Sequence, residues 1–214
     1  MNSVARMSAR RAPSPEDRGK TAERTRERIL DAAVAEFGAK GYAGARTAGI
    51  AARAGVNQQL ISYYFGGKQG LLTELCRRRQ QAESSMVPPD ASFEESVAAY
   101  LDAILDHPDW ARLVVWQALG DRPFADAEED ERFAEARRST TAKALEGIRH
   151  RQRDGEVTGE IDPAFALLVA YAVVLSPITM PQFVQDIFGE DPLAPSVRRR
   201  LHEQLVKLLG TAEG

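Results

Sequence analysis

The chain has 214 residues, with 28 Lys or Arg against 31 Asp or Glu, so its formal net charge is −3. This length corresponds to one large or two small domains, and 43% hydrophobic with 28% charged residues excludes wholesale disorder. Cysteine occurs once, at Cys76, which excludes an intramolecular disulfide and indicates a reducing compartment.

The charges are unevenly distributed along the chain. Residues 1–80 hold 15 basic and 7 acidic residues, a net of +8, whereas residues 81–214 hold 13 and 24, a net of −11. Such asymmetry is typical of a nucleic-acid-binding end joined to a different module, although a basic solvated face would give the same balance.

Two segments bear on targeting. Residues 1–20 are basic but lack an apolar stretch behind them, so we expect a flexible basic arm rather than a secretory signal. Residues 163–185 carry no charge, yet their strongly apolar part, residues 164–175, is shorter than the roughly 20 residues that span a bilayer. We therefore expect a buried or interfacial helix there, no membrane partner, and a cytoplasmic protein.

Glycines punctuate a helical pattern in the first part of the chain. Ile29 and Phe37 recur at helical spacing, and Gly41 stands where a C′ glycine would end that helix. Thr47 and Asn57 are suitable caps for two short helices on either side of Gly55. The expected helices cover residues 22–40, 47–54, 57–64 and 68–84.

The segment from Pro88 to Asp90 is the clearest linker and lies close to the change of charge. Beyond it, Pro163 and Pro195 each occupy a favourable first helical position, and no segment alternates as a strand does. The helices expected there cover residues 92–106, 109–119, 127–153, 163–176 and 195–209. We expect an all-α chain with an arm, a small domain and a larger domain over residues 1–20, 21–85 and 86–214.

The two short helices around Gly55 predict a helix-turn-helix. A tight turn favours a positive φ angle, which glycine tolerates, and it holds the second helix at a steep angle suited to a DNA major groove. Ile50, Ala51, Val56 and Ile61 are apolar and suit the small core that fixes this angle. A helical hairpin that does not bind DNA is the alternative.

Residues 25–72 resemble the TetR family of bacterial transcriptional regulators. The resemblance is carried by residues 29–33, Phe37, Gly41, Thr47 and residues 50–56, and it continues through residues 60–68 to Leu71 and Leu72. It implies an all-α fold with a three-helix DNA-binding domain, followed by a helical domain for ligand binding and dimerisation.

The resemblance also implies roles for individual residues. Thr47 and Lys68 correspond to phosphate contacts, Gln58 and Gln59 to the base-reading face, and Tyr63 to an aromatic backbone or thymine contact; glutamine suits adenine. The full set of expected DNA contacts is Arg46, Thr47, Asn57, Gln58, Gln59, Ser62, Tyr63 and Lys68.

Three positions depart from the family pattern. Ser62 stands where tyrosine is frequent, which shortens or removes a phosphate contact. Ala48 stands where some members have a base-reading arginine, for which Arg46 is a partial substitute. Gly49 lowers the stability of a short helix by about 1 kcal/mol relative to alanine, for which close approach to DNA would be one explanation.

The acidic half resembles no specific ligand class, and its expected roles come from the general plan of the family. Apolar stripes on residues 167–174 and 201–209 suit a four-helix dimer interface, with packing inside one subunit as the alternative. Aromatic residues suggest a pocket for a small apolar or amphipathic ligand, and a break in the helix at Pro177 and Pro181 would open it. The expected lining is Tyr100, Trp116, Phe124 and Tyr171.

Catalysis finds no support in the sequence. The three histidines are scattered, no metal-ligand spacing or nucleophile motif occurs, and we expect no cofactor or metal and no enzyme activity. The predicted function is a homodimeric regulator, usually a repressor, that a ligand releases from a palindromic site on double-stranded DNA. The alternative is a TetR-like protein controlled by a protein partner, or one that acts in chromosome organisation without a small inducer.

Overall fold

The computed structural model describes residues 15–83, 87–88, 90–121 and 127–211. In these residues it has ten helices and one isolated bridge, between Val157 and Gly210, so the all-α prediction is confirmed. The helices are α1 (Pro15–Gly44), α2 (Thr47–Ala54), α3 (Gln59–Phe65), α4 (Lys68–Glu83), α5 (Phe93–Leu105), α6 (Pro108–Ala118), α7 (Ala127–Arg153), α8 (Pro163–Thr179), α9 (Pro181–Phe188) and α10 (Pro195–Leu209).

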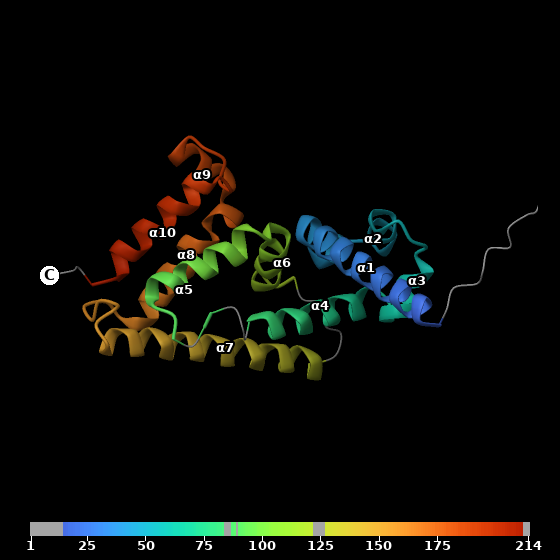
Figure 1. Cartoon of the computed structure of the whole chain (residues 1–214), viewed down its shortest axis with the longest axis horizontal. Helices are drawn as coiled ribbons and strands as arrows, with labels where there is room; N and C mark the ends of the chain where they lie inside the picture. Colours follow the sequence, from blue (N-terminus) through green and yellow to red (C-terminus); the bar gives the residue numbers. More distant parts are fainter. Residues whose placement is uncertain (1–14, 84–86, 89, 122–126, 212–214) are drawn as a thin grey trace, which may run out of the picture.

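The helices are arranged along one long axis (Figure 1). Helices α1, α2 and α3 lie at one end, and α8, α9 and α10 lie at the other. Helix α4 leads away from the first end, α7 runs along one side of the second, and α6 stands between the two ends, where it packs against α1.

The first apolar core is shared by helices α1, α2, α3 and α4. Ile29, Phe37, Ile50 and Ile61 are completely buried in it, which fixes α2 and α3 against α1. Leu113 of α6 belongs to the same core, so the contact between the two ends of the molecule is apolar as well as close. Burial of each of these side chains contributes about 1.5–3 kcal/mol to the free energy of unfolding.

The second core joins α5, α7, α8, α9 and α10. Leu201, Leu205 and Leu209 of α10 are buried in it, whereas Leu208 is 55% exposed. The stripe expected at a dimer interface on α10 is therefore mostly core of its own subunit, and the other stripe, on residues 167–174, also packs against this core.

Several helix ends differ from the predictions. Helix α1 already begins at Pro15, inside the expected arm, because proline is favourable at a first helical position; the rest of the arm, residues 1–14, lies outside the described residues. Arg46 rather than Thr47 is the N-cap of α2. Asn57 lies one residue before the N-cap of α3, and its side chain accepts a hydrogen bond from the backbone of Gln59 at 2.8 Å.

The helix break expected at Pro177 and Pro181 is found at Pro181 and not at Pro177. Pro177 is buried inside α8, which continues to Thr179, and the chain bends by 95° before α9 begins at Pro181. Helix α9 was not predicted, because a helix of 8 residues behind a proline gives little periodicity to read.

Over the described residues, no single helix has the length and apolar character needed to cross a membrane; α8 and α9 meet that test only as a bent pair.

Candidate nucleic-acid interface and ligand cavity

The turn between α2 and α3 is built around Gly55. Its φ and ψ angles are 62° and 41°, in the left-handed region that glycine favours, and its N–H satisfies the end of α2. Arg28 of α1 donates hydrogen bonds to the carbonyl oxygens of Ala54 and, at 3.2 Å, of Gly55. Arg28 thus braces the turn, a role that the sequence did not reveal because its partners lie on another helix.

Glu36 is a buried charge that positions the start of α2. Its side chain is 3% exposed, and its carboxylate lies 2.7 Å from Lys40 Nζ and 4.0 Å from Arg53. The hydrogen bond from Lys40 holds the pKa of Glu36 below its ordinary value, and a backbone hydrogen bond from Arg46 adds to this effect. A Cβ at Gly49 would lie 2.7 Å from the same carboxylate, so Gly49 makes room for Glu36.

Polar side chains form the outer face of α3 and the turn before it. Asn57, Gln58, Gln59 and Ser62 are exposed, and Tyr63 is 78% exposed with its ring against Tyr64. Exposed amides and a phenol on a short, firmly packed helix are the groups that read base edges in a major groove.

The residues expected to contact phosphate lie beside this face. Gln58 Nε2 donates to Thr47 Oγ1 at 2.8 Å, which links α3 to the first residue of α2. Arg46 is exposed immediately before α2. Lys68 begins α4, and its Nζ lies 4.2 Å from the ring centroid of Tyr42, a cation–π contact that limits where the ammonium group can move.

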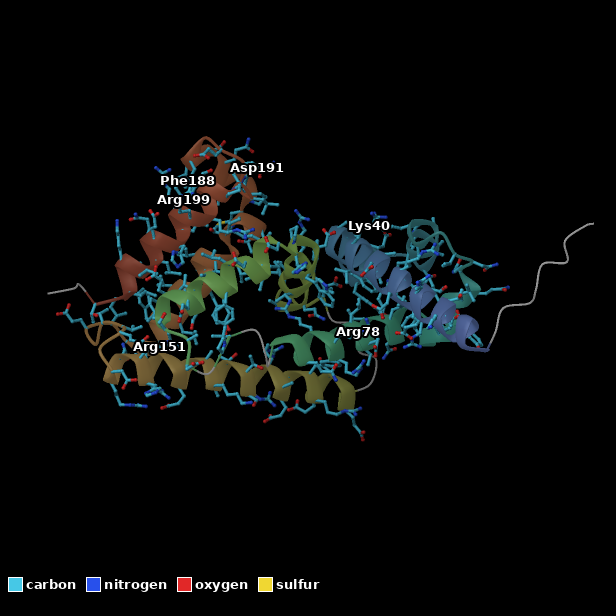
Figure 2. The ribbon with its side chains drawn as sticks, in the orientation of Figure 1. Lys40, Arg78, Arg151, Phe188, Asp191 and Arg199 are labelled. Carbon is cyan, nitrogen blue, oxygen red and sulfur yellow. The ribbon has the colours of Figure 1, made fainter. Side chains whose placement is uncertain are left out.

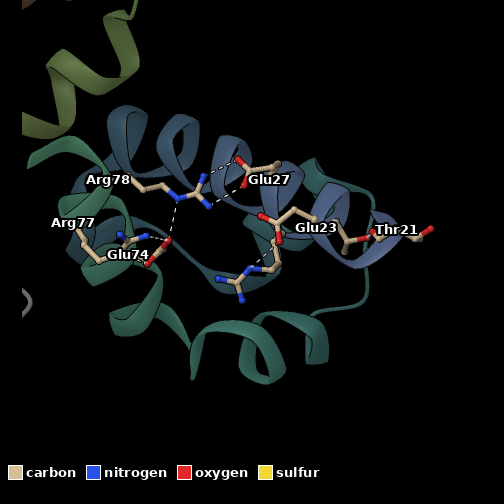
Figure 3. A network of polar contacts seen from close by, with 8 residues as sticks. Thr21, Glu23, Glu27, Glu74, Arg77 and Arg78 are labelled. Atoms are coloured by element: carbon tan, nitrogen blue, oxygen red, sulfur yellow. Dashed lines mark hydrogen bonds and ion pairs between the residues drawn. The ribbon is translucent and has the colours of Figure 1, made fainter. Parts of the chain in front are cut away.

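An ion-pair network ties α4 to α1. Arg78 lies between Glu27 of α1, at 2.7 Å, and Glu74 of its own helix, at 3.0 Å (Figure 3). Arg77 also bonds Glu74 at 2.7 Å. Hydrogen bonds from Arg77 and Arg78 lower the pKa of Glu74 from 4.5 to about 2, with the Arg77 bond the larger cause.

A cavity of about 470 Å³ lies between α5, α7 and α8 in the second half of the chain. Tyr100 and Tyr171 both line it. Trp116 does not line it: its Nε1–H donates to the backbone oxygen of Gly38 at 3.2 Å, in the contact between α6 and α1. Phe124, the fourth expected lining residue, lies outside the described residues.

The end of α6 also holds the kink in α1. Gly41 interrupts α1 with φ 67° and ψ 175°, and the Asp121 carboxylate accepts hydrogen bonds from the backbone of Tyr42 and, at 3.2 Å, of Ala43. Gly38 faces the backbone of Asp109 so closely that a Cβ would lie 2.5 Å from its oxygen. Sequence reasoning missed these contacts, because their partners are more than 70 residues apart.

A helix-turn-helix with an exposed polar second helix, joined to a helical domain that holds a cavity, defines a DNA-binding transcriptional regulator. Residues 29–75 match the family described as "Bacterial regulatory proteins, tetR family". Residues 93–207, more than half of the chain, match "Tetracyclin repressor-like, C-terminal domain". This chain belongs to the TetR family, whose members are DNA-binding transcriptional regulators and not enzymes.

Individual relatives agree with this assignment. The chain is 30% identical over 175 residues to the HTH-type transcriptional repressor SCO4008 of Streptomyces coelicolor, covering 78% of this chain and 85% of that protein. It is 33% identical over 110 residues to the HTH-type transcriptional repressor NicS of Pseudomonas putida, covering 48% and 52%. The structure of the putative transcriptional regulator SCO4942 from Streptomyces coelicolor superposes with a TM-score of 0.66 at 25% identity, covering 86% and 98%. The ketosteroid transcriptional regulator KstR2 of Mycobacterium tuberculosis shares the fold, with a TM-score of 0.67 at 14% identity and coverage of 87% and 95%.

Proposed function

We propose that this regulator is a repressor that binds a palindromic operator as a homodimer and leaves it when a small apolar or amphipathic molecule occupies the cavity. The observation that carries the proposal is the separation of two sites: the polar face of α3 lies at one end of the molecule, and a cavity of about 470 Å³ lies toward the other. The relatives SCO4008 and NicS, both named as repressors, support the same direction of regulation.

In the proposed complex α3 enters the major groove. Gln58 and Gln59 each offer an amide that matches the N6 and N7 edge of adenine. Because Gln58 Nε2 already donates to Thr47 Oγ1, the Thr47 hydroxyl proton is directed away from Gln58 and is free to reach a phosphate. Lys68 and Arg46 add positive charge at the starts of α4 and α2, where phosphate contacts would set the register on the duplex.

The proposed dimer surface lies on the last three helices. Large exposed apolar side chains gather there, and a monomer in water gains nothing from exposing them. Phe165 and Leu168 are three residues apart on α8 and so share a face. Pairing through a two-fold axis would present two copies of α3 to two half-sites, which requires a palindromic operator. The exposed residues that form this surface are Phe165, Leu168, Met180, Phe183, Ile187 and Leu208.

Helix α6 is the proposed connection between the cavity and the DNA. It contacts α5 and α8, which line the cavity, and it reaches α1 through Leu113, Trp116 and, just beyond its end, Asp121. A ligand that binds better when α6 is displaced would shift the population away from the DNA-bound arrangement. A filled core would favour control by a protein partner or a role in chromosome organisation. The open cavity instead supports control by a ligand.

The test is a selection of genomic fragments by the purified protein, followed by titration of the recovered site. We expect a palindromic site bound by a dimer of twice the 23.5 kDa chain mass. Loss of preference at one base pair of each half-site in Gln58→Ala would support the proposed readout. Equal weakening on every sequence would contradict it.

A further inference from the structure

We propose that the cavity selects an amphipathic anion, a molecule with an apolar body and one negatively charged head group such as a carboxylate or sulfonate. This inference rests on the proposed function only in taking the cavity between α5, α7 and α8 as the ligand site. It commits to a sign of charge, which neither the family nor its named relatives supply.

The charged residues that line the cavity are all of one sign. Lys143 and Arg151, both on α7, belong to its lining, and the lining residues that the structure describes include no carboxylate. An anion gains from both groups, whereas a cation would be repelled by both. The cavity lining therefore favours anionic over cationic ligands of the same shape.

Arg151 is held in place and keeps donor capacity. Its Nη2 donates to Ser96 Oγ at 2.8 Å and to the backbone oxygen of Ala91 at 2.9 Å, which fixes the guanidinium beside the start of α5 (Figure 2). Its Nε is buried and has no hydrogen-bond partner among the described residues. The Glu156 carboxylate lies 3.8 Å from this nitrogen, close enough for an ion pair but too far for a hydrogen bond, and it already accepts a hydrogen bond from the backbone of Phe93.

Lys143 lies two helical turns before Arg151 on the same face, about 12 Å along α7. It is exposed and makes no ion pair within the described part of the chain, so its ammonium group is available to an incoming head group. Gly147 lies between the two cations, and a Cβ there would meet Arg151 Nη1 at 3.3 Å. Gly147 therefore leaves space on the helix surface beside the guanidinium.

The rest of the cavity suits an apolar body. Val97, Ile104, Leu167 and Val174 line it, and small Ala144 and Ala170 leave its volume unfilled. A volume of about 470 Å³ lies within the range of roughly 300–1,000 Å³ that is usual for small-molecule sites. A neutral molecule would fill this space but would leave the charge of Lys143 without a partner.

The test uses two fluorescent probes that differ by one charged group. Full-length protein is titrated with 1-anilinonaphthalene-8-sulfonate and with neutral N-phenyl-1-naphthylamine. We expect Lys143→Met to raise the Kd of the sulfonate about tenfold, the equivalent of about 1.4 kcal/mol, and to leave the Kd of the neutral probe within about twofold. Lys143→Arg should restore sulfonate binding, and Arg137→Met, which removes a positive charge from the same helix outside the cavity lining, should change neither probe.

Competition identifies the site of binding. Decanoate should displace the sulfonate from the wild-type protein, and decyltrimethylammonium, with a chain of the same length, should not. Equal displacement by both amphiphiles, or an equal effect of Lys143→Met on both probes, would overturn the inference.

Operator binding is measured on the same samples. Selective operator binding together with no preference for the anion would overturn this inference and leave the repressor proposal standing. Retained preference for the anion without selective DNA binding would overturn the repressor proposal instead.

Discussion

At the DNA-binding end of the molecule, a Cβ at Gly38 would lie 2.5 Å from the backbone of Asp109 and one at Gly49 would lie 2.7 Å from Glu36, so neither of these helix contacts has room for a methyl group. At the other end, small residues on α7 and α8 leave a cavity of about 470 Å³. Close packing suits a reading surface whose side chains must meet base edges at fixed positions, whereas unfilled volume lets a ligand alter the packing around it.

Charge and apolar surface are distributed just as unequally. The first end buries Glu36 among cations and ties α4 to α1 through Arg78. The second end exposes large apolar side chains on its last three helices, among them Phe165 and Phe183. The first end thus fixes its helices with charged contacts, whereas the second end exposes the apolar side chains that form the proposed dimer surface.

The largest expected effect is on packing between α1 and α6. Gly38→Ala should lower the free energy of unfolding by about 1–3 kcal/mol, because the added methyl group meets the backbone of Asp109, which cannot turn aside. Gly19→Ala, in the same helix with nothing within 4 Å of the added Cβ, is the control and should be neutral or slightly stabilising. Urea denaturation measures both, and equal effects would show that the first end is no more tightly packed than an exposed helix.

Acid should loosen the first end through Glu74. Its pKa is lowered from 4.5 to about 2, so its ion pairs stabilise the fold fully above pH 4.5, and this contribution is lost as the pH falls toward 2. Because its partners are partly exposed, we expect these ion pairs to contribute about 1 kcal/mol to the free energy of unfolding. Denaturation of wild type and Glu74→Gln at pH 6 and pH 3 measures the difference, which should shrink at the lower pH. If the difference in the free energy of unfolding between the two proteins is the same at both pH values, the ion pairs of Glu74 do not stabilise the fold.

The salt dependence of operator binding should separate the two ends. Lys68→Ala should reduce the slope of log affinity against log salt by about two units, because each of the two protomers in the proposed dimer loses one phosphate contact. Lys207→Ala, on α10 at the opposite end, should leave the slope unchanged. Fluorescence anisotropy at several salt concentrations measures both slopes, and an unchanged slope for Lys68→Ala would remove that residue from the interface.

The smallest expected effect on stability is at the cavity. Ala170→Leu adds apolar volume where there is space, so the free energy of unfolding should stay within about 1 kcal/mol of wild type. The same variant should bind 1-anilinonaphthalene-8-sulfonate more weakly. Destabilisation as large as that of Gly38→Ala would mean that the second end is packed as tightly as the first.

Local features were predictable from the sequence. Gly55 and the apolar residues around it predicted the helix-turn-helix, because a tight turn and a short amphipathic helix depend on neighbours in the chain. The role of Gly49 was not predictable, since the group it accommodates, Glu36, belongs to another helix. Trp116 was equally ambiguous, because an aromatic residue suits a pocket or a helix contact, and only the fold decides between them.

The C-terminal helices show the same limit. The leucine stripe on α10 correctly predicted a helix with one apolar face, but periodicity does not say whether that face meets its own subunit or another. Leu201 and Leu205 turn out to be core, and the exposed apolar residues lie partly on α9, which the pattern did not reveal.

The most direct test of the central claim is operator binding measured with and without an amphipathic anion. We expect that a dimer binds a selected palindromic site, that decanoate lowers this affinity, and that Ala170→Leu, which narrows the cavity, makes the affinity less sensitive to decanoate. An operator affinity that decanoate lowers equally in wild type and Ala170→Leu would contradict the claim that the cavity at one end controls the reading surface at the other.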